Sequence, residues 1–413
     1  MARIHGIVAR RLTLQNRGLV ATLSNRFPSK ARLALAGLLL IAHLGVIVTG
    51  LSGDWNPTFA RLTVPAMPQP FGDFRVVAAA PVSADQGLDP LVANPNDPGN
   101  RRLNYPRVWI SIGRLFPGED GVIAAGLILA FLFSGIVAWL IATQRTMSAS
   151  IGLLVVSLSP ATWLALERGN NDLLIFGLIA LGILIPWRYR TVLLGVATIL
   201  KIYPFVAMVM RAIRERTLIS FGILVAMAVY LIAIYRDLMQ ISETTEVAGF
   251  LSFGIKSVTL LFAGSDYPFT AGVNYGLFAV GTVVALILGL KVPHRDKLSS
   301  YEEEAVLLVG TMLLFCFVTA SNWDYRLIFS LLLIPYFLRP ATGGERVIGW
   351  TAVVMIALAS NYTTLMNLED PGVLLNTAAK YVLYCILVFS VTRVIVRTDD
   401  VQFMIENWRA TAK

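Results

Sequence analysis

Leu200-Lys201-Ile202-Tyr203-Pro204-Phe205 lies in the middle of an otherwise apolar stretch of this chain. Placing a lysine at the centre of a membrane helix costs roughly 2.5–3.5 kcal/mol, so such a residue usually faces a polar cavity. Pro204 removes a backbone hydrogen bond of a helix, and at membrane depth the freed groups need protein or water as partners. The stretch therefore predicts a helix that is broken inside the membrane next to a polar pocket. The alternative is that Lys201 extends to the lipid headgroups.

The composition of the chain is that of a membrane protein. Hydrophobic residues make up 56% of the 413 residues, charged residues make up 14%, and the mean hydropathy is +0.69. Because soluble domains contain about 25% charged residues, we expect an all-α polytopic membrane protein. Cys316 and Cys385 lie in apolar segments, which argues against a disulfide framework. The histidines are scattered and no HExxH or CxxC spacing occurs, so no zinc site is expected.

The net charge of +9 is explained by the N-terminal segment and does not indicate a nucleic-acid partner. Residues 1–30 contain basic residues and no acidic residue, as the positive-inside rule expects of a cytoplasmic tail. The apolar run 33–51 is too long for the core of a secretory signal peptide and lacks a clear cleavage site. We therefore expect it to be the first transmembrane helix. The basic residues of the tail are Arg3, Arg10, Arg11, Arg17, Arg26 and Lys30.

Further apolar stretches near the length of a bilayer crossing follow. The segment 193–210, which contains the lysine and the proline, has arginines on both flanks, so one full crossing would violate the positive-inside rule. A re-entrant hairpin of two half-helices with its tip near Lys201–Pro204 resolves this conflict. The total is then about 10–12 transmembrane helices, with both termini in the cytoplasm. The other stretches are 122–143, 151–166, 173–186, 218–235, 273–290, 305–320, 327–338, 347–359 and 373–394.

We expect one transmembrane domain, residues 31–396, between the tail at 1–30 and a second cytoplasmic tail at 397–413. Its long first outer loop, 52–120, combines a helix-forming stretch with turn signals such as Asn104-Tyr105-Pro106. Parts of this loop are too apolar for a free tether, so we expect short interfacial helices. The remaining outer loops are expected at 167–172, 236–272, 321–326 and 361–372.

Polar clusters gather in the expected outer loops. Carboxylates and amides hydrogen-bond to hydroxyls, aromatic rings stack on sugar rings, and Arg or Lys pairs with phosphate. Structural alternatives stay open: Asn170-Asn171-Asp172 can cap the next helix, Asp73 can be a solvated carboxylate, and 322–326 can be a tight turn. The clusters lie at 72–75, 87–90, 103–107, 167–172, 264–268 and 321–326.

In this order the motifs resemble the GT-C superfamily, integral-membrane glycosyltransferases that use polyprenyl-phosphate sugars. Within it the chain is most similar to glycosyltransferase family 87, the polyprenyl-phosphate-mannose-dependent mannosyltransferases, which include the α-1,2-mannosyltransferases of phosphatidylinositol mannoside synthesis. The resemblance covers most of the chain, residues 30–340, and departs from the family pattern at Leu91 and Arg107. The matching motifs are Asp73, Gly87 with Asp89-Pro90, Asn104-Tyr105-Pro106, Arg168-Gly169-Asn170-Asn171-Asp172 and Lys201-Ile202-Tyr203-Pro204.

The resemblance implies a GT-C type bundle and an inverting sugar transfer in which Asp73 is the general base for the acceptor hydroxyl. Such a transfer also needs cations that stabilise charge on the departing phosphate, and the candidates are Lys201, Arg168 and Arg326. The expected sugar- and acceptor-binding residues are Asp89, Asn104, Tyr105, Arg107, Asn170, Asn171, Asp172, Tyr203, Asn322 and Asp324.

The expected partners are a polyprenyl-phosphate sugar, with mannose first, a lipid or glycan acceptor on the extracytoplasmic face of the plasma membrane, and membrane lipids. No cofactor is expected, because metal-independent transfer is favoured over a divalent cation held by the carboxylates of Asp73, Asp89, Asp172 and Asp324. Two alternatives stay open. A lipid-linked glycan polymerase or ligase would depend on arginines in a large late outer loop, and a secondary transporter would show paired broken helices.

Overall fold

The computed structural model describes residues 28–185, 187–215, 218–244, 251–255, 267–292, 298–319, 322–366 and 369–397. Within these ranges the chain is helical and has no strand, apart from an isolated antiparallel bridge between Ser252 and Trp323. The expected all-α class is therefore confirmed. The expected tails, 1–30 and 397–413, fall almost wholly outside the described residues, as do most residues of the 236–272 loop beyond Thr244.

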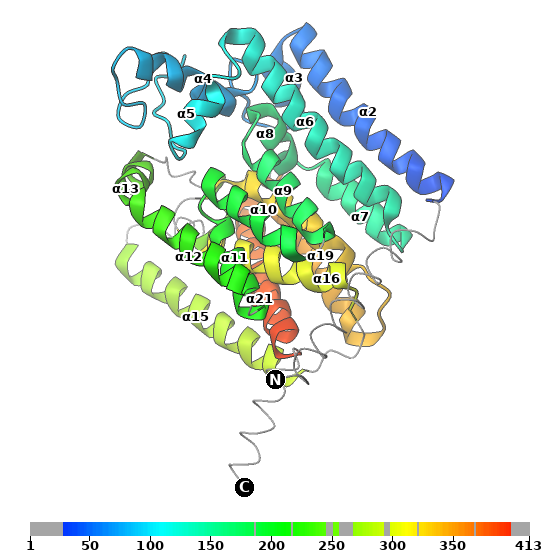
Figure 1. Ribbon diagram of the computed structural model, residues 1–413. Coiled ribbons are helices and arrows are strands. Elements are labelled where there is room, and N and C mark those ends of the chain that lie inside the picture. Colours follow the sequence, from blue (N-terminus) through cyan, green and yellow to red (C-terminus); the bar gives the residue numbers. More distant parts are fainter. Residues whose placement is uncertain are drawn as a thin grey trace.

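The N-terminal half contains two long helices with a group of short helices between them. In Figure 1 the long helix α2 runs along α6, and the short helices α3, α4 and α5 lie together at the upper end of the molecule. The short helices of the first loop agree with the expectation from its sequence. The bounds are α2 Lys30–Ser52, α3 Trp55–Ala60, α4 Gly72–Asp85, α5 Val108–Gly113, α6 Gly118–Thr143, α7 Met147–Ser157, α8 Pro160–Arg168 and α9 Asp172–Leu184.

The second half continues with helices that pack below this end. The C-terminal helix α21 contacts α15 and α19, and Figure 1 shows it in red and orange among the lower helices. The bounds are α10 Trp187–Leu200, α11 Pro204–Glu215, α12 Leu218–Ala233, α13 Tyr235–Thr244, α15 Tyr267–Lys291, α16 Ser300–Ala305, the π-helical turn η2 Val306–Gly310, α17 Thr311–Val318, the 3₁₀-helix η3 Asp324–Leu333, α18 Ile334–Phe337, α19 Gly343–Ser360, α20 Tyr362–Met366 and α21 Glu369–Val396.

Several helices are long and apolar enough to cross a membrane. Among the described residues three single helices qualify, namely 23 residues of α2 and 26 residues each of α6 and α21. The number rises to five if the bent pairs α7–α8, with a 55° bend, and α12–α13, with a 62° bend, are each counted as one span. The chain is thus an α-helical membrane protein, while the finer expectation of about 10–12 crossings stays a prediction.

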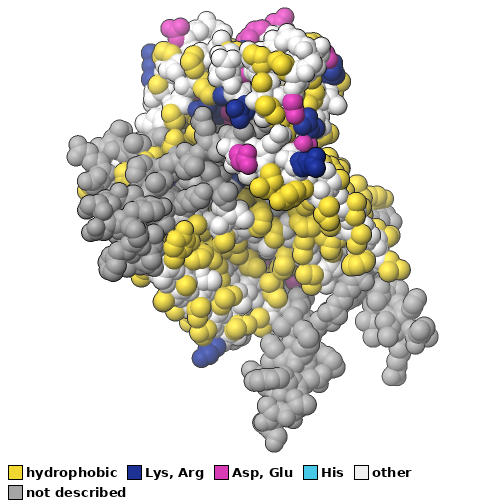
Figure 2. Space-filling view, turned by 90° about the vertical axis from the view of Figure 1, so that its left-hand side faces the viewer, with side chains coloured by type: hydrophobic (Ala, Val, Ile, Leu, Met, Phe, Trp, Pro, Cys, Tyr) yellow, Lys and Arg dark blue, Asp and Glu magenta, His cyan; other side chains and the backbone are white. Residues whose placement is uncertain are grey.

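The surface divides into a charged end and an apolar flank. Figure 2 shows Lys, Arg, Asp and Glu side chains gathered at the upper end, with mostly hydrophobic side chains below. On α12 the side chains of Leu218 and Ile232 are 90% and 74% exposed. Exposed apolar area of this extent marks a membrane-facing surface.

The helix containing the lysine and the proline is broken at the expected place. α10 ends at Leu200 and α11 begins at Pro204, where the missing N–H is an unpaired helix-start group in any case. The carbonyl freed at Leu200 accepts a 2.8 Å hydrogen bond from Trp109 Nε1, and that of Ile199 accepts one of 3.2 Å from Tyr230. The protein thus supplies the partners that the break requires.

The two helices around the break form a hairpin. Arg190 near the start of α10 and Arg211 near the end of α11 both pair with Glu304 Oε1, at 2.7 and 2.5 Å. Because one carboxylate holds both side chains, the far ends of α10 and α11 lie side by side. The expected hairpin with its tip at Lys201 is confirmed as a chain path.

Candidate functional site

A cavity of about 820 Å³ opens where several expected outer loops meet the tip of the hairpin. Its wall is built by the first loop, the end of α8, the break after α10, α13, α17, the segment before η3 and the first turn of η3. It is lined by Met67, Asp73, Val76, Gly99, Asn100, Arg101, Arg102, Asn104, Tyr105, Pro106, Arg168, Lys201, Ile202, Tyr203, Leu238, Ile241, Ser242, Phe315, Thr319, Asn322, Trp323, Tyr325 and Arg326.

The ammonium of Lys201 lies inside the protein, at the floor of this cavity. Lys201 is only 6% exposed and pairs with the carboxylate of Asp172. Its ammonium also lies 5.1 Å from the ring centre of Tyr105 and 6.0 Å from that of Tyr325. A cation between aromatic rings and a carboxylate is held at one place, as an anion-binding group needs to be.

Asp172 is the buried anchor of this floor. Its Oδ1 accepts a 2.7 Å hydrogen bond from the Tyr203 hydroxyl, and its Oδ2 lies 3.6 Å from Arg326 Nε. The guanidinium of Arg326 stacks 5.0 Å from the Tyr203 ring centre. Asp172 thus positions Lys201, Tyr203 and Arg326 from beneath and does not line the cavity itself.

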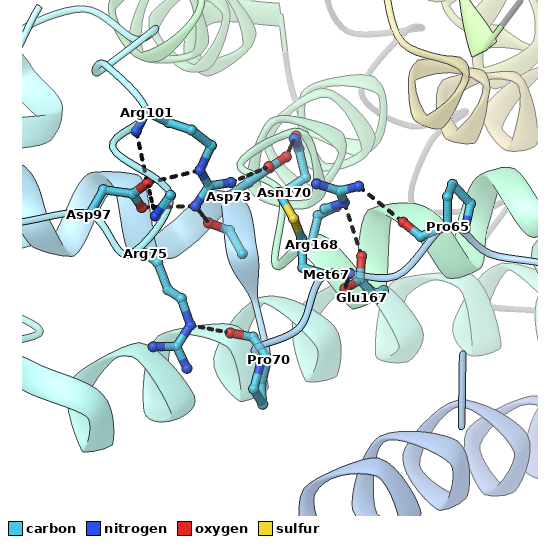
Figure 3. Close-up of polar contacts among 12 residues, drawn as sticks. Pro65, Met67, Pro70, Asp73, Arg75, Asp97, Arg101, Glu167, Arg168 and Asn170 are labelled. Carbon is cyan, nitrogen blue, oxygen red and sulfur yellow. Dashed lines mark hydrogen bonds and ion pairs between the residues drawn. The ribbon is translucent and has the colours of Figure 1, made fainter. Parts of the chain in front are cut away.

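Asp73 lies in the first turn of α4, where the helix dipole stabilises a carboxylate. Its Oδ2 accepts a 2.6 Å hydrogen bond from Asn170 Nδ2, and its Oδ1 is 3.8 Å from Arg101 Nη1. Figure 3 shows Arg101 between Asp73 and Asp97 on one side and Asn170 facing Asp73 on the other. The start of α4 is held by Phe71, which precedes the helix and packs its ring against Gly126 of α6. The packing is so close that a Cβ added to Gly126 would lie 2.2 Å from this ring.

A single amide links the carboxylate and the ammonium. Asn170 donates to Asp73 through Nδ2 and accepts from Lys201 Nζ at 3.3 Å through Oδ1. The same oxygen accepts the backbone N–H of Asp172 at 2.8 Å, so Asn170 also serves the helix start as the capping alternative expected. Asp73 and Lys201 therefore lie in one cavity with one side chain between them.

Arg168 lines the cavity beside the first loop. Its Nε pairs with Glu167 Oε2 at 3.0 Å, its Nη2 donates to the Pro65 carbonyl at 3.1 Å, and its guanidinium lies 5.9 Å from the Trp323 ring centre. Glu167 is fully buried and accepts hydrogen bonds from Trp55 Nε1 and the Met67 backbone N–H. The end of α8 is thus fastened to the first loop (Figure 3).

Some of the expected binding residues do not line the cavity. Asn170 and Asn171 are fully buried behind it, and Asn171 makes no side-chain capping bond although it holds the cap position of α9. Asp324 turns away from the cavity and pairs with Lys380 at 2.8 Å. Asp89 and Arg107 pair with each other at 2.8 Å outside the cavity. The residues that do line it as expected are Asp73, Asn104, Tyr105, Arg168, Lys201, Tyr203, Asn322 and Arg326.

The structure adds residues that the sequence reasoning missed. Arg101 holds Asp73 on the side away from Asn170 and donates to Asp97 through Nε at 2.9 Å. Arg102 also lines the cavity, as do Trp323 and Tyr325 of the expected cluster 321–326. Arg101 follows the turn-rich run 94–99 after Asn100, and its proximity to Asp73 across the loop has no signal in the sequence.

Three of the four carboxylates considered for a divalent cation pair with different basic residues. Asp89 pairs with Arg107, Asp172 with Lys201 and Asp324 with Lys380. Across the described ranges, no group of three or more His, Cys, Asp or Glu side chains has the geometry of a metal site.

Gly169 is required by the turn between α8 and α9. Its φ is +55°, and an added Cβ would lie 2.9 Å from the Cβ of Phe71. Gly169→Ala is expected to lower the free energy of unfolding by about 1–2 kcal/mol, because a Cβ is disfavoured in the left-handed region. Gly135→Ala on α6 is the control, since nothing lies within 4 Å of its added Cβ. Thermal unfolding in detergent measures both, and equal melting temperatures would contradict the prediction.

Arg107 links the first loop to α13, since it pairs with Asp89 at 2.8 Å and with Asp237 at 2.9 Å. The hydrogen bond from Arg107 holds the pKa of Asp89 below its ordinary value of 3.8. A lowered carboxylate pKa stabilises the fold above pH 3.8, and this contribution is lost as the pH falls through the lowered value. Arg107→Gln should therefore lower stability at pH 7 by up to about 1 kcal/mol, with the difference closing below about pH 3.8.

Thermal unfolding of Arg107→Gln and the wild type over a pH series checks this. The Arg114–Asp85 pair, 2.6 Å and exposed at the end of α4, provides the control variant Arg114→Gln, which leaves Asp89 untouched. A difference for Arg107→Gln that persists unchanged at acidic pH would contradict the assignment.

Comparisons of this chain with protein-family models, with characterised proteins and with solved structures find no match. The fold and the site together define an α-helical membrane protein with a basic, aromatic-lined cavity.

Proposed function

We propose that the protein is a membrane glycosyltransferase that moves a sugar, with mannose first, from a polyprenyl-phosphate donor to a lipid or glycan acceptor. The observation that carries the proposal is the pairing of Asp73 and Lys201 across Asn170 in one cavity. A base for an alcohol and a cation for a phosphate are the two groups that this transfer needs.

The charge of the cavity supports an anionic donor. Its lining contains Arg101, Arg102, Arg168, Lys201 and Arg326, with Asp73 as a carboxylate among them. An excess of cations in a low-dielectric concave site concentrates anions and stabilises charge that develops on a departing phosphate. Lys201 and Arg326 both pair with Asp172, so the two cations lie close together. We therefore assign the donor phosphate to the part of the cavity that these two residues line.

Asp73 is the group placed to take the proton of the acceptor. Its Oδ2 is engaged by Asn170, whereas Oδ1 lies 3.8 Å from Arg101 and keeps lone pairs for a hydroxyl. As the acceptor oxygen attacks the anomeric carbon, the proton passes to Asp73 and the bond to the phosphate oxygen breaks. One base and no paired nucleophile fit a single displacement with inversion.

The apolar part of the wall suits a lipid. Leu238 and Ile241 of α13 and Phe315 of α17 are part of the lining, and Phe315 is 38% exposed. An isoprenoid tail leaving the cavity along these side chains would remain in an apolar environment while its phosphate stays at Lys201. The stacked rings of Trp323 and Tyr325, 6.2 Å apart, offer a surface for the sugar.

Purified protein in nanodiscs, incubated with labelled polyprenyl-phosphate-mannose and a panel of lipid and glycan acceptors, tests the proposal. The expected result is transfer of label to one acceptor with release of polyprenyl phosphate. Absence of transfer from every polyprenyl-phosphate sugar offered, with uptake of a solute into proteoliposomes, would replace the proposal with the transporter alternative.

A further inference from the structure

Lys380 is a buried charge that the proposed reaction does not use. It lies on α21 within the apolar run 373–394 and has no exposed surface. Its ammonium donates to Asp324 Oδ2 at 2.8 Å and to the Ser252 carbonyl at 3.2 Å, and it lies 5.1 Å from the Tyr362 ring centre. A charge at this depth is costly unless it is paired, and such residues commonly serve function.

The partner of Lys380 belongs to the segment that enters the cavity. Asp324 begins η3, and its neighbours Trp323, Tyr325 and Arg326 line the cavity although Asp324 does not. The side chain of Asp324 points away from the cavity, whereas those of its neighbours point into it. Holding Asp324 in place therefore also fixes the orientation of these neighbours in the cavity.

Lys380 also holds a second segment of the chain, around Ser252, against the segment 322–326. Ser252 forms an antiparallel bridge with Trp323, and the Phe253 N–H donates to the Asn322 carbonyl at 2.6 Å. Lys380 bonds to Ser252 and to Asp324, one on each side of this short pairing. One ammonium therefore ties α21 to both partners of the pairing that carries Trp323.

We propose that Lys380 and Asp324 are positioning residues that hold Arg326 and Tyr325 in the cavity for the donor. The expected effects on kinetics depend on the proposed function, because they assume that the protein transfers a sugar. Its conformational consequences do not depend on that function, because they concern only the segment 322–326.

A purely structural role is the alternative, and α21 offers a matched control. Arg393 is another buried cation of α21, which pairs with Glu345 and donates to the Val292 carbonyl at 3.0 Å. Neither Arg393 nor Glu345 lines the cavity. Arg393→Met therefore removes a buried cation from the same helix without touching the segment 322–326.

Hydrogen–deuterium exchange of the segment 322–326 tests the positioning directly. Lys380→Met and Asp324→Asn should each raise the exchange rate of this segment about tenfold. Each variant breaks the Lys380–Asp324 ion pair, the only buried ion pair between this segment and α21 among the described contacts. Arg393→Met should leave exchange there unchanged. The double variant Lys380→Met/Asp324→Asn leaves no unpaired buried charge, so it should regain thermal stability while exchange in 322–326 stays fast.

Steady-state kinetics of the same variants test the consequence for the donor. A displacement of about 1 Å in a binding group can cost about 10²-fold in rate, so Lys380→Met should lower kcat and raise the KM for the donor, with the acceptor KM unchanged. Lys380→Arg, which keeps the charge, should recover part of the activity, and Arg393→Met should remain near the wild type.

Recovery of wild-type exchange and kinetics in the double variant would overturn the proposal, as would a Lys380→Met protein with wild-type exchange in 322–326. If the wild type itself transfers no sugar, the proposed function fails, and the exchange measurements alone decide on the positioning role.

Discussion

Replacing Asp73 by asparagine should lower the rate of sugar transfer by about 10²–10⁴-fold, the usual contribution of a general base. Asparagine has nearly the same shape, but it cannot take the proton of an acceptor hydroxyl. The hydrogen bond from Asn170 Nδ2, 2.6 Å in the wild type, can be kept by the remaining carbonyl oxygen. Donor binding should therefore survive, because the phosphate is assigned to Lys201 and Arg326 on the other side of Asn170.

The measurement is single-turnover transfer together with equilibrium binding of the donor to the same preparation. Asp85→Asn is the matched control, since Asp85 ends the same helix α4 and pairs with Arg114 at 2.6 Å outside the cavity. Its transfer rate should stay within about twofold of the wild type, as for other surface changes remote from a site. Full activity of Asp73→Asn would remove Asp73 from the role of base.

The break in the hairpin could be predicted because its physical causes are local. A lysine and a proline within a few residues of each other have costs in a membrane helix that depend little on the rest of the fold. The charge rule then required the chain to return, and the shared contact of Arg190 and Arg211 with Glu304 shows that it does. Residues from four of the five segments expected as outer loops, 52–120, 167–172, 236–272 and 321–326, line the cavity.

The directions of individual side chains could not be predicted in the same way. Asp324 and Arg326 are two residues apart in one polar run, yet Arg326 lines the cavity and Asp324 is buried against Lys380. Asp89 and Arg107 are both polar residues of the first loop, and the structure pairs them with each other. Which neighbour a loop carboxylate meets depends on tertiary packing, and no periodicity in the sequence records it.

Lys380 is different, because its signal was present in the sequence. It is the single charged residue in the apolar run 373–394 before Arg393, and the physical argument that drew attention to Lys201 applies to it equally. It lacks a nearby proline, so the sequence predicts an ordinary membrane span there. Glu167 belongs to the polar cluster 167–172, but its hydrogen bonds to Trp55 and Met67 follow only from the fold.

The last prediction concerns Lys201 itself. Lys201→Met should lower the free energy of unfolding by about 3–5 kcal/mol, because it leaves the carboxylate of Asp172 buried without its ammonium partner. Asp172 has no exposed surface, and the guanidinium of Arg326, 3.6 Å away, is not close enough to replace that partner fully. The measurement is thermal or chemical unfolding of the variant in detergent.

The double variant Lys201→Met/Asp172→Asn separates folding from ligand binding. With both charges of the pair removed, only the guanidinium of Arg326 loses a carboxylate, one 3.6 Å away, and its side chain is 19% exposed, so most of the lost stability should return. The amide at 172 can still accept the Tyr203 hydroxyl, which keeps that side of the floor in place. Donor affinity should nevertheless fall about tenfold to 10²-fold, since a charge-assisted hydrogen bond to phosphate is worth roughly 1.5–3 kcal/mol. A stable double variant that binds the donor as tightly as the wild type would show that the phosphate does not lie at Lys201.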